Sequence, residues 1–150
     1  MSFPKTDYVR PKAKVPKSRL KQLMNQMGGF CGYCGTEVFY PKRGDTKKSC
    51  YVRSSTATTD HIISLSKGGA HAKENMICCC FQCNAQKRNM HLEEFRGYLY
   101  HRLNRMPLFS GDQIEWLEEN GFQFPERYVP FFFEQAGFVF CPKNGLQEPK

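Results

Sequence analysis

The residues best suited to chemistry lie between positions 60 and 84. Asp60 stands directly before His61, and two asparagines follow at positions 75 and 84. A histidine can take up a proton near neutral pH, and carboxylate and amide oxygens are ligands that Mg²⁺ and Mn²⁺ prefer. Together these residues predict a compact catalytic metal site; they are Asp60, His61, Asn75 and Asn84.

Two Cys-x-x-Cys pairs, separated by 45 residues, indicate a second metal site. They supply four soft thiolate ligands, which suit tetrahedral zinc with no open coordination position. A closed shell leaves no place for water or substrate, so this zinc is expected to be structural. Its predicted ligands are Cys31, Cys34, Cys80 and Cys83.

The cysteines beside the second pair offer an alternative choice of metal ligand. Using Cys79 in place of Cys80 would break the two-residue spacing, so Cys80 is the preferred ligand. Cys78 and Cys79 are expected to be small buried residues, because free cysteines often behave as hydrophobic side chains.

The cysteine pattern and the hydropathy of the chain indicate the cellular compartment in which the protein is expected. Eight cysteines in 150 residues could suit a disulfide scaffold, but the two Cys-x-x-Cys pairs and the lack of an apolar N-terminal leader favour zinc in a reducing environment. No stretch approaches the roughly 20 apolar residues that span a bilayer. We therefore expect a cytoplasmic protein without a membrane partner.

The charge is positive and unevenly distributed. The net charge is +8, and residues 1–53 hold twelve Lys or Arg against three acids, whereas residues 106–150 hold three against seven. Basic side chains that neutralise phosphates release condensed counterions, so a nucleic acid is the expected partner of the front of the chain. Residues 1–19, rich in lysine and proline, suit either a phosphate-contacting arm or a solubilising tail.

Hydrophobic spacing and turn residues predict the elements that position these side chains. Leucine and phenylalanine recur every three or four residues after Asn84, and β-branched residues lead into Asp60. Ser18, and Ser110 or Asp112, can cap helices. The predicted helices cover residues 18–27, 83–105 with a break near 89–90, and 112–120, and the predicted strands cover residues 51–59 and 75–79.

The order and spacing of these motifs resemble the HNH endonuclease family. The resemblance rests on Asp60-His61-Ile-Ile-x-Leu-Ser-x-Gly-Gly69, on Asn75, and on Cys80-x-x-Cys83-Asn84-x-x-Lys87. It covers the chain from Cys31 to about Phe95 and looks most like the branch whose core is pinned by four cysteines. A ββα-metal fold is therefore implied.

The resemblance also divides the chemistry among the residues. It implies that His61 is the general base, that Asp60 and Asn84 hold Mg²⁺ or Mn²⁺, and that Asn75 braces the ribbon and aims His61. The family often has histidine at the position of Asn84, and asparagine there still supplies an oxygen ligand. Ser64 stands where the family usually has proline.

Other polar residues near the motif are candidates for supporting roles. Lys87 and Arg88 are candidates for contacts with substrate phosphate, and Lys87 suits a solvated helix face equally well. His71 is expected to be a solvated loop residue, and His91 and His101 to be surface or packing residues.

We expect an α+β fold in three parts. A flexible basic arm (1–19) precedes an HNH nuclease domain with the zinc site (20–105), and an acidic, aromatic extension (106–150) packs on the core or binds a partner. The extension is also the expected surface for a homodimer or a larger complex.

The expected activity is metal-dependent hydrolysis of DNA phosphodiester bonds, which by resemblance leaves 5′-phosphate and 3′-hydroxyl ends. The residues do not choose between DNA and RNA, or between a nick and a double-strand break. Two alternatives stay open: a non-catalytic zinc-stabilised nucleic-acid-binding module, and an adaptor of a larger phage or restriction complex.

Overall fold

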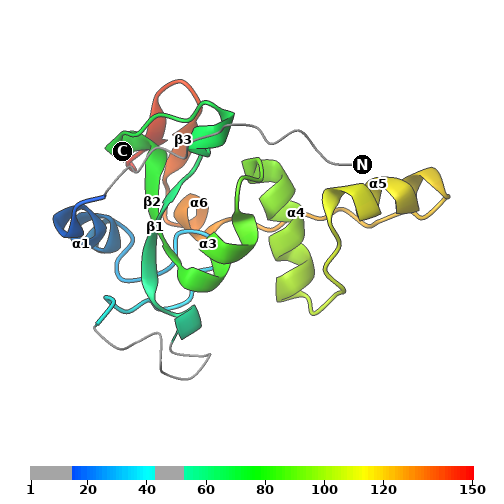
Figure 1. Ribbon diagram of the computed structural model, residues 1–150, viewed down its shortest axis with the longest axis horizontal. Coiled ribbons are helices and arrows are strands. Elements are labelled where there is room, and N and C mark those ends of the chain that lie inside the picture. Colours follow the sequence, from blue (N-terminus) through cyan, green and yellow to red (C-terminus); the bar gives the residue numbers. More distant parts are fainter. Residues whose placement is uncertain (1–14, 43–52) are drawn as a thin grey trace, which may run out of the picture.

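The computed structural model describes residues 15–42 and 53–150 (Figure 1). Most of the basic arm and Cys50 therefore lie outside the described residues. Helix α1 spans Lys17–Gln26, close to the prediction, but its N-cap residue is Pro16, without a side-chain capping bond, rather than Ser18. The helix ends before Gly28 and Gly29, which both adopt positive φ angles that glycine tolerates.

A two-stranded antiparallel ribbon forms the centre of the site. Strand β1 spans Ala57–His61 and strand β2 spans Met76–Cys80, and His61 pairs with Met76. The predicted first strand began at residue 51; within the described residues it begins only at Ala57, because residues 53–55 form a helical turn. All five residues of β2 are buried, as expected of a strand covered on both faces.

The connection between the strands contains two short 3₁₀ helices. Helix η2 spans Leu65–Lys67 and helix η3 spans Lys73–Asn75. Gly68, between them, has a φ of 85°, a left-handed conformation that suits glycine.

The chain passes directly from β2 into a helix, which gives the order strand, strand, helix. Helix α3 spans Phe81–Lys87 and helix α4 spans Leu92–Leu103. The predicted break in the long helix is confirmed; it falls at Arg88, whose φ of 50° takes the backbone out of the helical conformation.

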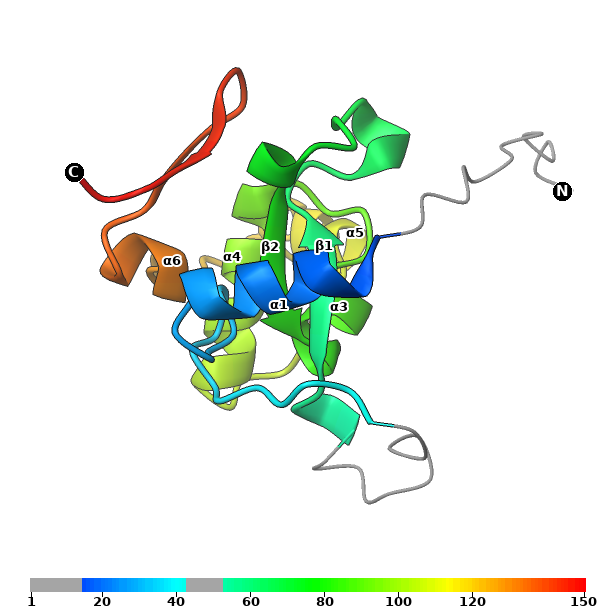
Figure 2. The same cartoon turned by 90° about the vertical axis from the view of Figure 1, so that its left-hand side faces the viewer.

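Two helices cover opposite faces of the ribbon. Figure 2 shows α1 crossing in front of β1 and β2, with α3 behind them. The ribbon is therefore the middle layer, and α3 brings its side chains to the end of β1 that carries Asp60 and His61.

The C-terminal part contains more regular structure than the sequence indicates. Helix α5 spans Gly111–Glu119 and is capped by Ser110, one of the two predicted caps. Helix α6 spans Phe132–Gln135, and a hairpin joins strand β3 (Val139–Cys141) to strand β4 (Gly145–Gln147). Figure 1 shows α5 extending away from the ribbon, whereas α6 lies beside it.

Residues near the C-terminus complete the hydrophobic core. Phe131 and Phe133 are at most 1% exposed, and both rings pack against Tyr33. The backbone N–H of Phe133 donates to the carbonyl of Gly32 at 2.9 Å. The α+β class is confirmed, with the aromatic tail joined to the segment that carries the first cysteine pair. No helix among the described residues is long and apolar enough to cross a membrane.

Candidate active site and metal centre

The two Cys-x-x-Cys pairs come together in one cluster. The four Sγ atoms of Cys31, Cys34, Cys80 and Cys83 lie within 4.8 Å of one another, and those of Cys34 and Cys80 are 3.9 Å apart. Zn–S bonds of about 2.3 Å in a tetrahedron place sulfur atoms about 3.8 Å apart. The cluster therefore has the donors and the spacing to hold a metal ion, and zinc fits both.

Local backbone geometry shapes each half of the cluster. The N–H of Cys34 donates to Cys31 Sγ at 3.5 Å, and the N–H of Cys83 donates to Cys80 Sγ at 3.3 Å. These bonds stabilise negative charge on the sulfurs. Gly32 is required in the first turn, because a Cβ atom there would lie 2.3 Å from Ile77 Cδ1.

The cluster contains Cys80, the cysteine preferred from the sequence, and not Cys79. Cys78 and Cys79 are both 0% exposed on β2. Burial raises the pKa of the Cys78 thiol to about 12, which keeps it protonated. Both residues act as small core side chains, as expected.

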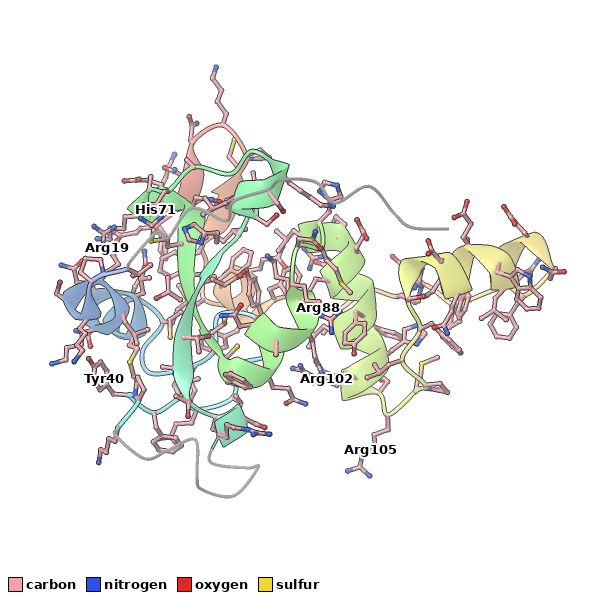
Figure 3. The ribbon with its side chains drawn as sticks, in the orientation of Figure 1. Arg19, Tyr40, His71, Arg88, Arg102 and Arg105 are labelled. Atoms are coloured by element: carbon pink, nitrogen blue, oxygen red, sulfur yellow. The ribbon has the colours of Figure 1, made fainter. Side chains whose placement is uncertain are left out.

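Arg102 links helix α4 to the cysteine cluster. Its Nη2 lies 3.1 Å from Cys83 Sγ, and its Nη1 donates to Gln86 Oε1 on α3 at 2.5 Å. A divalent metal ion held by four thiolates would carry a net negative charge, which the guanidinium would offset. Figure 3 shows Arg102 turned towards α3, whereas Arg105 points away from the body of the protein.

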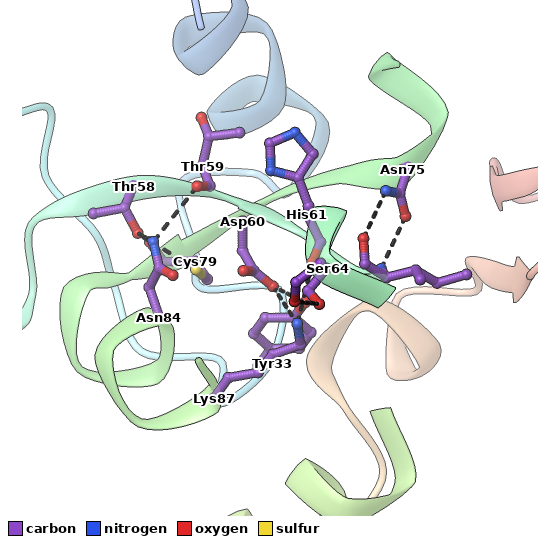
Figure 4. Close-up of polar contacts among 12 residues, drawn as sticks. Tyr33, Thr58, Thr59, Asp60, His61, Ser64, Asn75, Cys79, Asn84 and Lys87 are labelled. Carbon is purple, nitrogen blue, oxygen red and sulfur yellow. Dashed lines mark hydrogen bonds and ion pairs between the residues drawn. The ribbon is translucent and has the colours of Figure 1, made fainter. Parts of the chain in front are cut away.

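Asp60 is buried and held in one orientation. Its Oδ2 accepts a 2.6 Å hydrogen bond from the Tyr33 hydroxyl and lies 2.9 Å from Lys87 Nζ (Figure 4). Burial raises the pKa of Asp60, while the Lys87 cation and the Tyr33 hydroxyl act in the opposite direction. Burial also raises the pKa of Tyr33 well above its usual value, so Tyr33 remains a donor.

The position of Lys87 differs from both sequence interpretations. Its side chain is 0% exposed, so it lies neither on a solvated helix face nor at the surface where a phosphate would dock. Besides contacting Asp60, its Nζ donates to the backbone carbonyl of His61 at 3.1 Å. The ammonium group thus lies behind the predicted catalytic pair and fixes both residues of it.

Asn84 reaches back from α3 to β1. Its Nδ2 donates to Thr58 Oγ1 at 3.1 Å and to the carbonyl oxygen of Thr59 at 3.5 Å. These bonds use the amide nitrogen and so fix the direction of the amide oxygen. Asn84 and Asp60 both line an open hollow of about 630 Å³, as does the exposed Arg88.

His61 lines the same hollow and contacts a second histidine. His61 Nε2 lies 3.0 Å from His71 Nδ1, and the ring centroids are 5.2 Å apart. Burial lowers the pKa of His61, and the neighbouring His71 adds to that shift, which favours the neutral form that can accept a proton. His71 is exposed as expected, but it is a partner of His61 rather than a purely solvated side chain.

Asn75 braces the loop and does not touch the His61 ring. Its Oδ1 accepts from the N–H of Ile63 at 2.9 Å, and its Nδ2 donates to the carbonyl of Ile63 at 2.9 Å (Figure 4). The same Nδ2 also donates to the carbonyl of Ala70 at 2.8 Å. The predicted bracing contact is therefore present. Any effect on His61 must pass through the loop.

Two of the supporting residues have little or no signal in the sequence. Tyr33 lies inside the first Cys-x-x-Cys turn, so its position beside a metal-binding pair is the one available hint. Arg102 lies on a helix whose docking depends on the tertiary fold, and no local pattern marks it. His91 is exposed at the start of α4, and His101 is buried with Nδ1 2.9 Å from the Pro107 carbonyl, so each has one of the two expected roles.

Comparison with known proteins agrees with this geometry. Residues 48–99 match a protein-family model described as HNH endonuclease, a segment that contains β1, β2, α3 and the second cysteine pair. A search of curated proteins found no match to the chain.

Proposed function

We propose that this protein hydrolyses DNA phosphodiester bonds with the help of a divalent cation, and the match of residues 48–99 to a family model described as HNH endonuclease supports this proposal. The observation that carries this proposal is that Asp60, His61 and Asn84 line one open hollow. A base and two hard oxygen ligands for a cation are thereby available in one hollow, where a phosphate group could bind beside them.

The donor set suits Mg²⁺ or Mn²⁺. The Asp60 carboxylate and the Asn84 amide oxygen are both hard ligands, and two protein ligands leave positions for water and phosphate. Tyr33 and Lys87 hold one carboxylate oxygen of Asp60, so the other is the candidate ligand. A cation bound by Asp60 and Asn84 would stabilise the charge that develops on the leaving 3′-oxygen.

The protein residues supply the remaining chemistry. Neutral His61 takes a proton from water, and the resulting hydroxide attacks the phosphorus while the bond from phosphorus to the 3′-oxygen breaks. The released 3′-oxygen then takes a proton from solvent to give the 3′-hydroxyl. Lys87 and Tyr33 favour the ionised form of Asp60 and orient it, and Arg88 at the rim of the hollow contacts a phosphate oxygen. We assign Lys87 to positioning rather than to substrate binding, because its ammonium group is buried.

A nicking assay tests this proposal. Supercoiled plasmid is incubated with zinc-loaded protein and Mg²⁺ or Mn²⁺, beside His61→Ala and Asn84→Ala. Wild type should convert the plasmid to the open-circular form, and His61→Ala should lower the rate by about 10²- to 10⁴-fold, the contribution of a general base. His91→Ala, an exposed histidine outside the hollow, is the matched control and should retain full activity.

Two outcomes would change the assignment. Undiminished cleavage by His61→Ala would reject His61 as the base. DNA binding without cleavage by wild type would favour a non-catalytic nucleic-acid-binding module. An RNA strand of the same sequence, assayed in parallel, decides between DNA and RNA as substrate.

The identity of the structural metal is a separate question. We propose zinc at the four cysteines, because four thiolates in a closed tetrahedron suit it. Metal analysis after extensive dialysis should find about one zinc per chain, and Cys34→Ser should reduce it. A wild-type protein that is folded without any retained metal would contradict a structural zinc.

A further inference from the structure

The contact between His61 and His71 fixes which nitrogen of His61 is available for catalysis. His61 Nε2 is engaged at 3.0 Å by His71 Nδ1, so Nδ1 is the remaining nitrogen of the His61 ring. In a neutral imidazole only one nitrogen carries hydrogen. The proton in this contact therefore belongs to one ring or to the other, and its location decides whether His61 Nδ1 can act as a base.

One asparagine anchors both histidines. Asn75 holds the backbone of Ile63, two residues after His61, and the carbonyl of Ala70, one residue before His71. The N–H of Gly69 also donates to the Ser64 carbonyl at 3.0 Å. The loop is thus tied to the end of β1, and the backbone positions of the two histidines relative to each other are set by the fold.

We propose that His71 is a positioning residue for His61, whose Nε2–H it accepts at Nδ1, so that His61 Nδ1 presents a lone pair to the attacking water. The exposed His71 can carry its own proton at Nε2. When His61 Nδ1 takes the proton of water, His61 becomes a cation and its bond to His71 becomes charge-assisted. The contact therefore strengthens as the hydroxide forms. This inference rests on the proposed function.

Kinetics of two His71 variants provide the first test. His71→Phe keeps an aromatic ring but removes the acceptor, and should lower the single-turnover rate about tenfold or more, part of the contribution of a general base. His71→Asn places an amide oxygen near the position of Nδ1 and should recover most of that loss. DNA affinity, measured without divalent cation, should be the same in both variants, and His91→Phe should cleave like wild type.

The tautomer of His61 provides a test that does not depend on cleavage. Long-range ¹H–¹⁵N correlation spectra of the zinc-loaded protein should show His61 protonated at Nε2 and unprotonated at Nδ1. His71→Phe should replace this pattern with a mixture of tautomers, while His71→Asn should preserve it.

The two measurements separate the inference from the proposed function. A wild-type protein that fails to cleave, yet shows a His71-dependent tautomer, would reject the nuclease activity and leave the positioning contact intact. Unchanged rate and tautomer in His71→Phe would overturn the inference while the nuclease stands. Equal loss in His71→Phe and His71→Asn, or a loss that follows DNA affinity, would also overturn it.

Discussion

At the scale of single residues, the site depends on the buried side chains of Tyr33 and Lys87, which hold the residues proposed to contact the cation and the substrate. Asp60, His61 and Asn84 can be predicted from the sequence, because each is part of a spaced motif. The role of Tyr33 and the inward direction of Lys87 cannot be predicted in that way, since both follow from how the Cys31–Cys34 turn and α3 pack around Asp60. The sequence identifies the donors, and tertiary packing determines how they are held.

Loss of the buried ammonium group should be costly. Lys87→Met removes the cation that faces Asp60 and leaves a buried carboxylate with Tyr33 as its remaining donor. Removing one partner of a buried ion pair destabilises a protein by about 3–5 kcal/mol. Urea unfolding of the zinc-loaded protein should show a loss of this size.

The adjacent surface residue is the control for that measurement. Arg88→Met removes an exposed charge and keeps the same backbone conformation, so its free energy of unfolding should stay within about 0.5 kcal/mol of wild type. Equal stability of the Lys87 and Arg88 variants would show that the buried pair contributes little.

At the scale of elements, the junction of α3 and α4 is stabilised through the four-cysteine cluster. Arg102→Met removes the contact from α4 to Cys83 Sγ and to Gln86. Loss of a group that supports metal ligands typically lowers metal affinity about 10- to 100-fold. Competition with a chromogenic chelator should show this loss, and Arg105→Met, at an exposed position near the same helix end, should retain wild-type affinity.

The loop between the strands is closely packed at one glycine. A Cβ atom at Gly69 would lie 1.9 Å from the Ile63 carbonyl oxygen and 2.9 Å from Asn75 Nδ2. Gly69→Ala should therefore displace the brace formed by Asn75 and destabilise the protein by about 1–3 kcal/mol.

Hydrogen exchange can locate that effect. The Ile63 amide, which donates to Asn75, should exchange faster in Gly69→Ala. Gly111→Ala is the control, since a Cβ atom there meets nothing within 4 Å. If the Ile63 amide stays equally protected in both variants, the brace tolerates the added methyl group.

At the scale of the whole molecule, periodicity and turn chemistry predict α1, α5 and the break between α3 and α4. They do not predict α6 or the C-terminal hairpin, because these short elements are stabilised by contacts with distant residues. Arg96 on α4 contacts Glu134 on α6 at 2.6 Å, and Gly145 of β4 lies against Glu74 in the loop between the ribbon strands. The sequence places residues 106–150 in one separate extension. In the structure, α6 and the β3–β4 hairpin of that extension contact the core, whereas α5 extends away from the ribbon.

This division predicts different consequences for two changes in the extension. Truncation after Tyr128 removes Phe131, Phe133 and Glu134. Loss of each buried phenylalanine costs about 3–5 kcal/mol of folding free energy. The sum of the two losses approaches the whole stability of a typical domain, which is about 5–15 kcal/mol. The truncated chain should lack a cooperative thermal transition. Trp116→Ala on α5 alters a side chain that is 61% exposed and should leave the melting temperature unchanged. A truncated chain that melts cooperatively near the wild-type temperature would show instead that the ribbon, α3 and the four-cysteine cluster form a sufficient core.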